Sequence, residues 1–334
     1  MAETVLVTGG SGYIGGWCVV ELLRRGYVVR TTVRSLAKEP AVRAMIAAEV
    51  DPGDRLSFHA AELTADAGWD EATAGCDYVL HVASPLGTEM PDDPQVLIVP
   101  AREGALRALR AAEKAGVKRV VMTSSVAAAA SPGDDVETDE TVWTDPADPD
   151  AYRQSKMLAE KAAWDFAAAH PGFELATVMP SMVIGPVLTA ENMGSVQVVW
   201  RPLAGKMPGI PKLGFPLVDV RDVVDLHLRA MTMREAKGER FIASTEFLWM
   251  SEIAKIMRDG LGPRAPKVPT RNLPSFALRL MSVFDRTLRA VTPNLGRSRR
   301  FSSAKAQRML GWSPRPVETS VLDCAESLIA KGAA

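Results

Sequence analysis

The sequence predicts a doubly wound parallel α/β sheet followed by a smaller, mostly helical lobe. Short, nearly continuous apolar runs alternate with segments of helical periodicity as far as Pro180. Strands of this kind are buried on both faces of a sheet that helices cover. From Gly185 to Pro216 the alternation stops and glycine and proline become dense. We therefore expect a first domain over residues 1–180 and a lobe over residues 181–334, with part of the later chain returning to the first domain.

The expected strands are short runs rich in β-branched and aromatic residues. They are Thr4–Thr8, Tyr27–Val33, Leu56–Ala60, Tyr78–Val82, Val117–Thr123 and Leu175–Met179. In a parallel sheet with crossover helices, ligands bind at the carboxyl ends of the strands. Side chains that directly follow these runs are therefore the first candidates for a site.

The later part of the chain is expected to be mainly helical. The periodic segments are Asp222–Met233, Ser251–Arg258, Pro274–Val291, Ser303–Leu310 and Glu318–Ala330. In Pro274–Val291, residues such as Phe276 and Leu280 share one face, and Arg279 lies on the other. We expect that apolar face to pack on the core, and a membrane-surface or dimer contact is the alternative.

Composition excludes several classes of partner. The formal charge of −1 provides no overall field for nucleic acid or an anionic membrane. Every apolar run is interrupted well before the about 18 residues of a membrane span. Three scattered cysteines favour neither a disulfide framework nor a metal site, and the first residues do not resemble a leader. We expect a cytoplasmic protein with a small-molecule partner and no metal, and a homo-oligomer stays open.

A glycine-rich turn follows the first strand. Gly9 permits a tight turn, Gly12 allows a pyrophosphate to approach the backbone, and Gly15 allows close helix–strand contact. Tyr13 and Ile14 lie in the same turn, before the helix expected from Trp17 to Arg25, whose free N-terminal amides and positive dipole end favour anions. This context predicts a Rossmann-type dinucleotide site.

The second strand bears on the choice of nicotinamide cofactor. An NAD enzyme usually ends this strand with a carboxylate for the ribose 2′-hydroxyl, whereas a 2′-phosphate favours a guanidinium. Here the strand ends in Arg34, and no Asp or Glu occurs between Glu21 and Glu39. We expect NADP(H) to be preferred over NAD(H), unless Arg34 is only a surface residue.

Tyr152 and Lys156 are the main catalytic candidates. They lie four residues apart in a helical pattern, so the phenol and the ammonium share one face. A nearby cation is expected to lower the phenol pKa, ordinarily near 10, and to ease proton exchange with a carbonyl oxygen. Another strand ends in Thr123, Ser124 and Ser125, where a hydroxyl can bind a developing alkoxide or simply cap the strand.

These features together resemble the extended short-chain dehydrogenase/reductase family, in particular its dihydroflavonol reductase and cinnamoyl-CoA reductase branch. The likeness extends over nearly the whole chain. The stretches that carry it are Val28–Arg34, His81–Pro85, Asp139–Trp143, Pro180–Pro186 and Val218–Val223.

The resemblance implies a role for each matching residue. It makes Tyr152 the proton donor, Lys156 the group that lowers its pKa and holds the nicotinamide ribose, and Ser125 the oxyanion partner. It also implies a set of cofactor contacts, namely Arg34 at the 2′-phosphate, Glu62 and Leu63 at the adenine, Val82, Ala83 and Ser84 at the centre, and Pro180 to Val183 at the nicotinamide end. Thr123 and Ser195 are two further expected cofactor contacts.

Departures from the branch restrict the substrate. Ala41 replaces a second basic residue, although Lys38 and Arg43 lie near it in sequence, and Glu62 replaces an aspartate. Ala130 stands where dihydroflavonol reductases have an asparagine, and the N-W-Y-C-Y segment of cinnamoyl-CoA reductases is absent. A general aldehyde or ketone reductase fits better than either plant enzyme.

The resulting expectation is reversible, NADP(H)-dependent reduction of an apolar or aromatic carbonyl compound to an alcohol. Its pocket is expected between the sheet and the lobe, lined by Pro85–Met90, Val126–Ala130 and Met182–Trp200. An NAD-dependent hydroxysteroid dehydrogenase or sugar-nucleotide epimerase is one alternative. A non-catalytic dinucleotide sensor is another, although a sensor has no need for the Ser, Tyr and Lys set.

Overall fold

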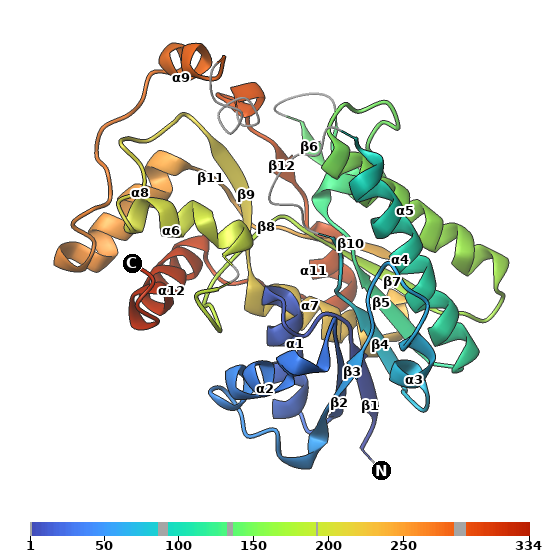
Figure 1. Cartoon of the computed structure of the whole chain (residues 1–334). Coiled ribbons are helices and arrows are strands. Elements are labelled where there is room, and N and C mark those ends of the chain that lie inside the picture. The colour runs from blue at the N-terminus through green and yellow to red at the C-terminus, as the bar shows by residue number, and fades with distance from the viewer. Residues whose placement is uncertain (1, 86–92, 132–135, 192, 284–291) are drawn as a thin grey trace.

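A seven-stranded sheet, parallel throughout, forms the centre of the computed structural model (Figure 1). Its spatial order is β10-β7-β5-β4-β1-β2-β3. In chain order the strands are β1 Thr4–Val7, β2 Val28–Val33, β3 Leu56–Ala60, β4 Tyr78–His81, β5 Arg119–Thr123, β7 Leu175–Pro180 and β10 Arg240–Ala243. The structure describes residues 2–85, 93–131, 136–191, 193–283 and 292–334. All six expected strands are present, and the predicted fold class is confirmed.

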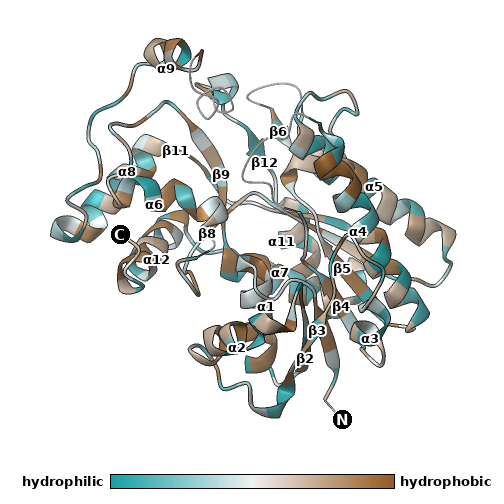
Figure 2. Ribbon diagram, viewed as in Figure 1, coloured by the Kyte–Doolittle hydropathy of each residue, from teal (hydrophilic) through white to brown (hydrophobic). Residues whose placement is uncertain are grey.

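Helices cover both faces of this sheet, which explains why its strands are apolar on both sides. One face packs against α1 Tyr13–Arg24, α2 Glu39–Ala47, α7 Val220–Thr232 and α11 Ala304–Leu310. The other face packs against α3 Trp69–Thr73, α4 Gln95–Lys114 and α5 Ala151–Ala169. Figure 2 shows hydrophobic residues concentrated in the central strands between these two layers.

The lobe has its own core around a three-stranded sheet in the order β11-β9-β8. The strands are β8 Met182–Ile184, β9 Gly214–Asp219 and β11 Phe247–Trp249, and the helices α6 Gln197–Leu203, α8 Met250–Leu261 and α12 Val317–Ala330 pack with them. The sequence pattern predicted α8 and α12, but neither α6 nor the three strands. Strands of three to six residues set among glycines and prolines show no alternation long enough to be recognised.

The chain returns from the lobe to the main sheet. Strand β10 pairs with β7 in parallel, from Arg240 opposite Thr177 to Ala243 opposite Pro180. Helices α7 and α11 share the core of α1 and the sheet. Residues after Pro180 therefore build one edge of the first domain as well as the lobe.

The remaining elements are short. A two-stranded pair joins β6 Glu137–Thr138 to β12 Arg300–Phe301. The 3₁₀ turns are η1 Leu36–Lys38, η2 Gly53–Arg55, η3 Val126–Ala129, η4 Gly194–Val196, η5 Arg234–Ala236, η6 Gly262–Arg264 and η7 Thr292–Asn294.

Helix α9, Ser275–Met281, corrects one expectation (Figure 1). The predicted helix Pro274–Val291 does begin here, but residues 284–291 lie outside the described part of the chain. Phe276 and Leu280 are 76% and 67% exposed, so the prediction that this face packs on the core is wrong for both residues. Among the described residues, no helix is long and apolar enough to cross a bilayer.

Candidate active site

The glycine turn connects β1 to α1, and its geometry depends on missing side chains. Gly9 has a φ of +73°, which favours glycine, and its carbonyl oxygen accepts the Gly12 N–H at 2.9 Å. A Cβ on Gly15 would lie 2.3 Å from the Gly9 carbonyl oxygen. The first turn of α1 can therefore approach the strand end only with glycine at position 15.

The start of α1 is suited to an anion. Gly12 is the N-cap, so no N-cap side chain caps the amides of the first turn. A Cβ on Gly12 would contact only the Gly9 carbonyl oxygen, at 3.2 Å, which leaves its outer side open. Uncapped amides at an open helix start fit the pyrophosphate of a dinucleotide.

Tyr13 fixes this helix start to the lobe. Its hydroxyl donates a hydrogen bond to the Gly185 carbonyl oxygen at 2.8 Å, and the Trp17 indole N–H donates to the Pro186 carbonyl oxygen at 2.9 Å. Burial raises the pKa of the Tyr13 phenol, which therefore stays a protonated donor. Tyr13 thus joins the two parts of the molecule directly beside the glycine turn.

The end of β4 packs against the same turn. The Thr8 hydroxyl oxygen accepts the N–H groups of Val82 and Ala83 at 3.0 and 2.9 Å, and lies 3.1 Å from His81 Nδ1. Burial, and next the charge of Lys156, lower the pKa of His81 to about 4. Thr8 was not predicted as a site residue. Its position, a hydroxyl at the end of an apolar strand directly before a glycine turn, is a pattern from which it could have been predicted.

Helix α5 presents Tyr152 and Lys156 at this edge of the sheet. Asp150 is the N-cap of this helix, which begins at Ala151, and its Oδ1 accepts the N–H groups of Tyr152 and Arg153. The Lys156 ammonium donates a hydrogen bond to Ser84 Oγ at 2.9 Å and lies 5.7 Å from the Tyr152 ring centroid. Lys156 is 7% exposed and Tyr152 is 36% exposed, so an enclosed cation lies beside an accessible phenol.

Three hydroxyls end strand β5, and they have different partners. Thr123 Oγ1 lies 2.7 Å from His227 Nε2, and Ser124 Oγ donates to Glu160 Oε2 at 2.5 Å. Ser125 Oγ accepts the Ala127 N–H at 3.1 Å and thereby caps η3. Of these three, only Ser125 has a hydroxyl that is not engaged with another side chain in the described structure, and its proton can still be donated.

A buried ion pair holds these elements together. Glu160 is fully buried and accepts hydrogen bonds from Ser124, from Thr177 at 2.8 Å and from Arg240 Nε at 2.8 Å. The Arg240 guanidinium lies 3.6 Å from the Trp143 ring centroid. This network links α5, β5, β7 and β10 behind the candidate site. Glu160 was not among the residues predicted from the sequence, although it follows Lys156 by four residues, the spacing of one helix face.

The other expected cofactor residues are distributed along the same edge. Arg34 directly follows β2, is exposed and forms no ion pair among the described residues, whereas Arg43 is engaged with Glu39 Oε1 and the Leu56 carbonyl oxygen. Glu62 is exposed after β3, and Leu63 packs against Gly104. Pro180 ends β7, and Val183 is buried in β8. The Ser195 hydroxyl donates to the Val183 carbonyl oxygen at 2.5 Å. The expected wall residues 86–90 lie outside the described residues.

The fold and this edge define a class of protein. The glycine turn follows the carboxyl end of β1, the serine follows the carboxyl end of β5, and the Tyr–Lys pair lies near the start of α5. A Rossmann-type dinucleotide enzyme has this arrangement. The family model described as "NAD dependent epimerase/dehydratase family" matches residues 5–243, and the chain belongs to this family.

Named relatives agree with this assignment. A cinnamoyl-CoA reductase of Medicago truncatula is 36% identical over 269 residues, which cover 78% of this chain and 81% of the relative. A dihydroflavonol 4-reductase of Arabidopsis thaliana is 33% identical over 323 residues, 92% and 77% of the two chains. The structure of Gre2 from Candida albicans in complex with NADPH is similar with a TM-score of 0.82 and 26% identity, over 98% of this chain and 99% of that one. The predicted family and the enzyme class, a nicotinamide-dependent oxidoreductase, are confirmed.

Proposed function

We propose that this protein reduces an aldehyde or ketone to an alcohol with NADP(H), reversibly, and that Tyr152 is the proton donor. The observation that carries the proposal is the position of the Lys156 ammonium, which bonds Ser84 Oγ at 2.9 Å and lies 5.7 Å from the Tyr152 ring centroid. One cation thereby connects the β4 segment expected to line the cofactor with the phenol expected to meet the substrate.

Each residue has a separate task in this proposal. When bound, the reduced nicotinamide supplies the hydride that the carbonyl carbon receives. Tyr152 gives its phenolic proton to the carbonyl oxygen, and the Lys156 charge stabilises the phenolate that remains. Ser125 donates a hydrogen bond to the same oxygen as negative charge develops there. In the reverse direction Tyr152 takes the proton back.

Arg34 supports the preference for NADP(H). It follows β2 where an NAD enzyme usually carries a carboxylate, and it is exposed without an ion pair among the described residues. A guanidinium can bind a 2′-phosphate through two hydrogen bonds. The Candida albicans relative was crystallised with NADPH, which agrees with this preference. The same features disfavour the NAD-dependent dehydrogenase and epimerase alternatives.

The substrate we propose is an apolar or aromatic carbonyl compound of moderate size. The named plant relatives act on cinnamoyl-CoA and on dihydroflavonols. Ala130 has no side-chain amide to hydrogen-bond a flavonoid, and its backbone N–H donates to Thr144 Oγ1 at 2.8 Å. A cytoplasmic location and a homo-oligomer remain predictions.

Replacing Tyr152 tests the proposed chemistry. NADPH consumption is measured against a panel of aldehydes, ketones and diketones with the parent, Tyr152→Phe and Tyr27→Phe. Loss of a general acid typically costs about a hundredfold or more in kcat, so Tyr152→Phe should lose most turnover and still bind NADPH. Tyr27, after the glycine turn helix, is the matched control and should leave turnover intact. Equal turnover in Tyr152→Phe and the parent would remove Tyr152 from the mechanism.

Replacing Arg34 tests the cofactor preference. Arg34→Asp introduces the carboxylate of an NAD enzyme, which repels a 2′-phosphate and accepts a ribose hydroxyl. The ratio of NADPH to NADH affinity should fall by about tenfold or more, the effect of losing a charged contact worth about 1.5–3 kcal/mol. Arg110→Asp, on the exposed side of α4, is the control. An unchanged ratio in Arg34→Asp contradicts the phosphate assignment.

A further inference from the structure

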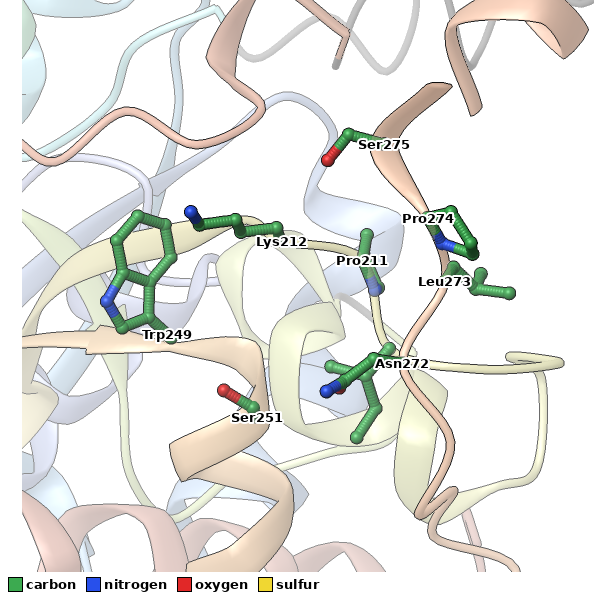
Figure 3. Close-up of a pocket in the computed structure, with 9 residues that line it drawn as sticks. Pro211, Lys212, Trp249, Ser251, Asn272, Leu273, Pro274 and Ser275 are labelled. Carbon is green, nitrogen blue, oxygen red and sulfur yellow. The ribbon is translucent and has the colours of Figure 1, made fainter. Parts of the chain in front are cut away.

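The lobe contains an open pocket of about 420 Å³ between β11, α9 and the loop before β9 (Figure 3). None of its lining residues belongs to the candidate active site. Trp249 and Pro211 give it apolar walls, and Lys212, Ser251, Asn272 and Ser275 supply polar groups. Its volume falls in the range of small-molecule sites.

Backbone hydrogen bonds hold the walls of this pocket in place. The Ile210 N–H donates to the Arg271 carbonyl oxygen and the Leu273 N–H donates to the Ile210 carbonyl oxygen, both at 2.8 Å. The Gly296 N–H donates to the Lys212 carbonyl oxygen, also at 2.8 Å. The pocket is therefore formed before any ligand arrives, which reduces the entropy that binding would cost.

The indole of Trp249 is also fixed. Trp249 ends β11 opposite Gly214, and its ring meets the Phe247 ring edge to face at a centroid distance of 5.0 Å. The Trp249 backbone N–H donates to Glu252 Oε2 at 2.7 Å, so this carboxylate caps α8. A rigid indole face is a suitable surface for stacking a flat ring.

The polar groups have no other partner in the part of the chain that the structure describes. Lys212 forms no ion pair there, and its ammonium lies 5.8 Å from the Trp249 ring centroid. The side chains of Ser251, Asn272 and Ser275 make no hydrogen bond within the described chain either. In Figure 3 these groups and the indole surround one space, with the Lys212 side chain extending across it toward Trp249.

We propose that this pocket binds a small planar aromatic carboxylate at a site separate from the catalytic one. The ring packs against Trp249 and Pro211, and the carboxylate accepts hydrogen bonds from the Lys212 ammonium and the Asn272 amide. A charge-assisted contact beside an aromatic wall selects an aromatic anion over a neutral or cationic ring of the same size.

Calorimetric titration of the whole chain with 2-naphthoate tests this site. Binding at millimolar or lower concentration is expected, and 2-naphthylmethanol, the neutral isostere, should bind more weakly. Lys212→Met keeps the aliphatic stem and removes the charge, and it should weaken naphthoate binding by about tenfold, equivalent to about 1.4 kcal/mol. Trp249→Leu should weaken both compounds.

The control is Lys206→Met, an exposed lysine of the lobe outside the pocket, which should bind naphthoate like the parent. Circular dichroism of each variant separates loss of the site from loss of the fold. Absence of naphthoate binding to the parent overturns the proposal. Equal affinity in the parent, Lys212→Met and Trp249→Leu also overturns it, because the anion would then bind elsewhere, such as in the cofactor cleft.

Discussion

Glu160→Gln is expected to destabilise the fold markedly, because it removes a buried negative charge. The side-chain volume hardly changes, so the effect reports on the charge. Glu160 is fully buried and its partner Arg240 has a side chain only 10% exposed, so the variant leaves an uncompensated buried cation. Breaking such a pair typically costs about 3–5 kcal/mol. With an unfolding entropy of about 2.1 cal/mol/K per residue, the 334-residue chain has about 0.7 kcal/mol/K, and a loss of about 4 kcal/mol lowers the Tm by about 6 °C.

Thermal unfolding followed by circular dichroism measures this shift. Glu103→Gln removes one carboxylate from a half-buried surface pair with Arg102 and should change stability by less than about 1 kcal/mol. The double variant Glu160→Gln/Arg240→Met removes both buried charges and should lose less than the sum of the single variants, with a coupling of about 1–3 kcal/mol. A Tm within about 1 °C of the parent for Glu160→Gln, or additive losses in the cycle, would refute the reasoning.

Two further predictions concern the glycine turn and the buried His227. Gly15→Ala should weaken NADPH binding by about tenfold or more, measured by cofactor fluorescence, because its Cβ would lie 2.3 Å from the Gly9 carbonyl oxygen and displace the helix start; parent-like affinity contradicts this. Burial lowers the pKa of His227 from 6.5 to about 4, so its contribution to stability is present above pH 6.5 and is lost as the pH falls toward 4, by up to about 3 kcal/mol. Urea unfolding between pH 7 and pH 4 should therefore show a shallower loss in His227→Gln than in the parent; parallel curves for the two proteins would exclude this histidine as a source of the pH dependence.

Much of the main sheet could be predicted because its signals are local. Leu56–Ala60 agrees with β3 at both ends, and the strand predicted to begin at Val117 begins at Arg119. Buried parallel strands must be apolar along their length, so each one is visible without knowledge of its neighbours. The glycine turn was equally visible, because its backbone geometry restricts residue choice at Gly9 and Gly15.

The lobe was less predictable for a physical reason. Its strands β8 and β11 have three residues each, and their hydrogen bonds go to β9, which lies more than 25 positions away from each of them in sequence. Helix α9 shows the opposite failure, since a clear apolar periodicity at Phe276 and Leu280 did not lead to burial. Periodicity states which residues share a face, and tertiary packing decides whether anything covers that face.

The sequence by itself determined the doubly wound sheet, the dinucleotide turn and the residue types of the candidate site, since each depends on a short stretch of chain. Only the tertiary structure decided which of these residues meet. The Lys156 ammonium reaches Ser84 across 72 positions of sequence, and Glu160 pairs with Arg240 across 80. Contacts of this kind depend on the order in which parallel strands assemble, which no local pattern encodes.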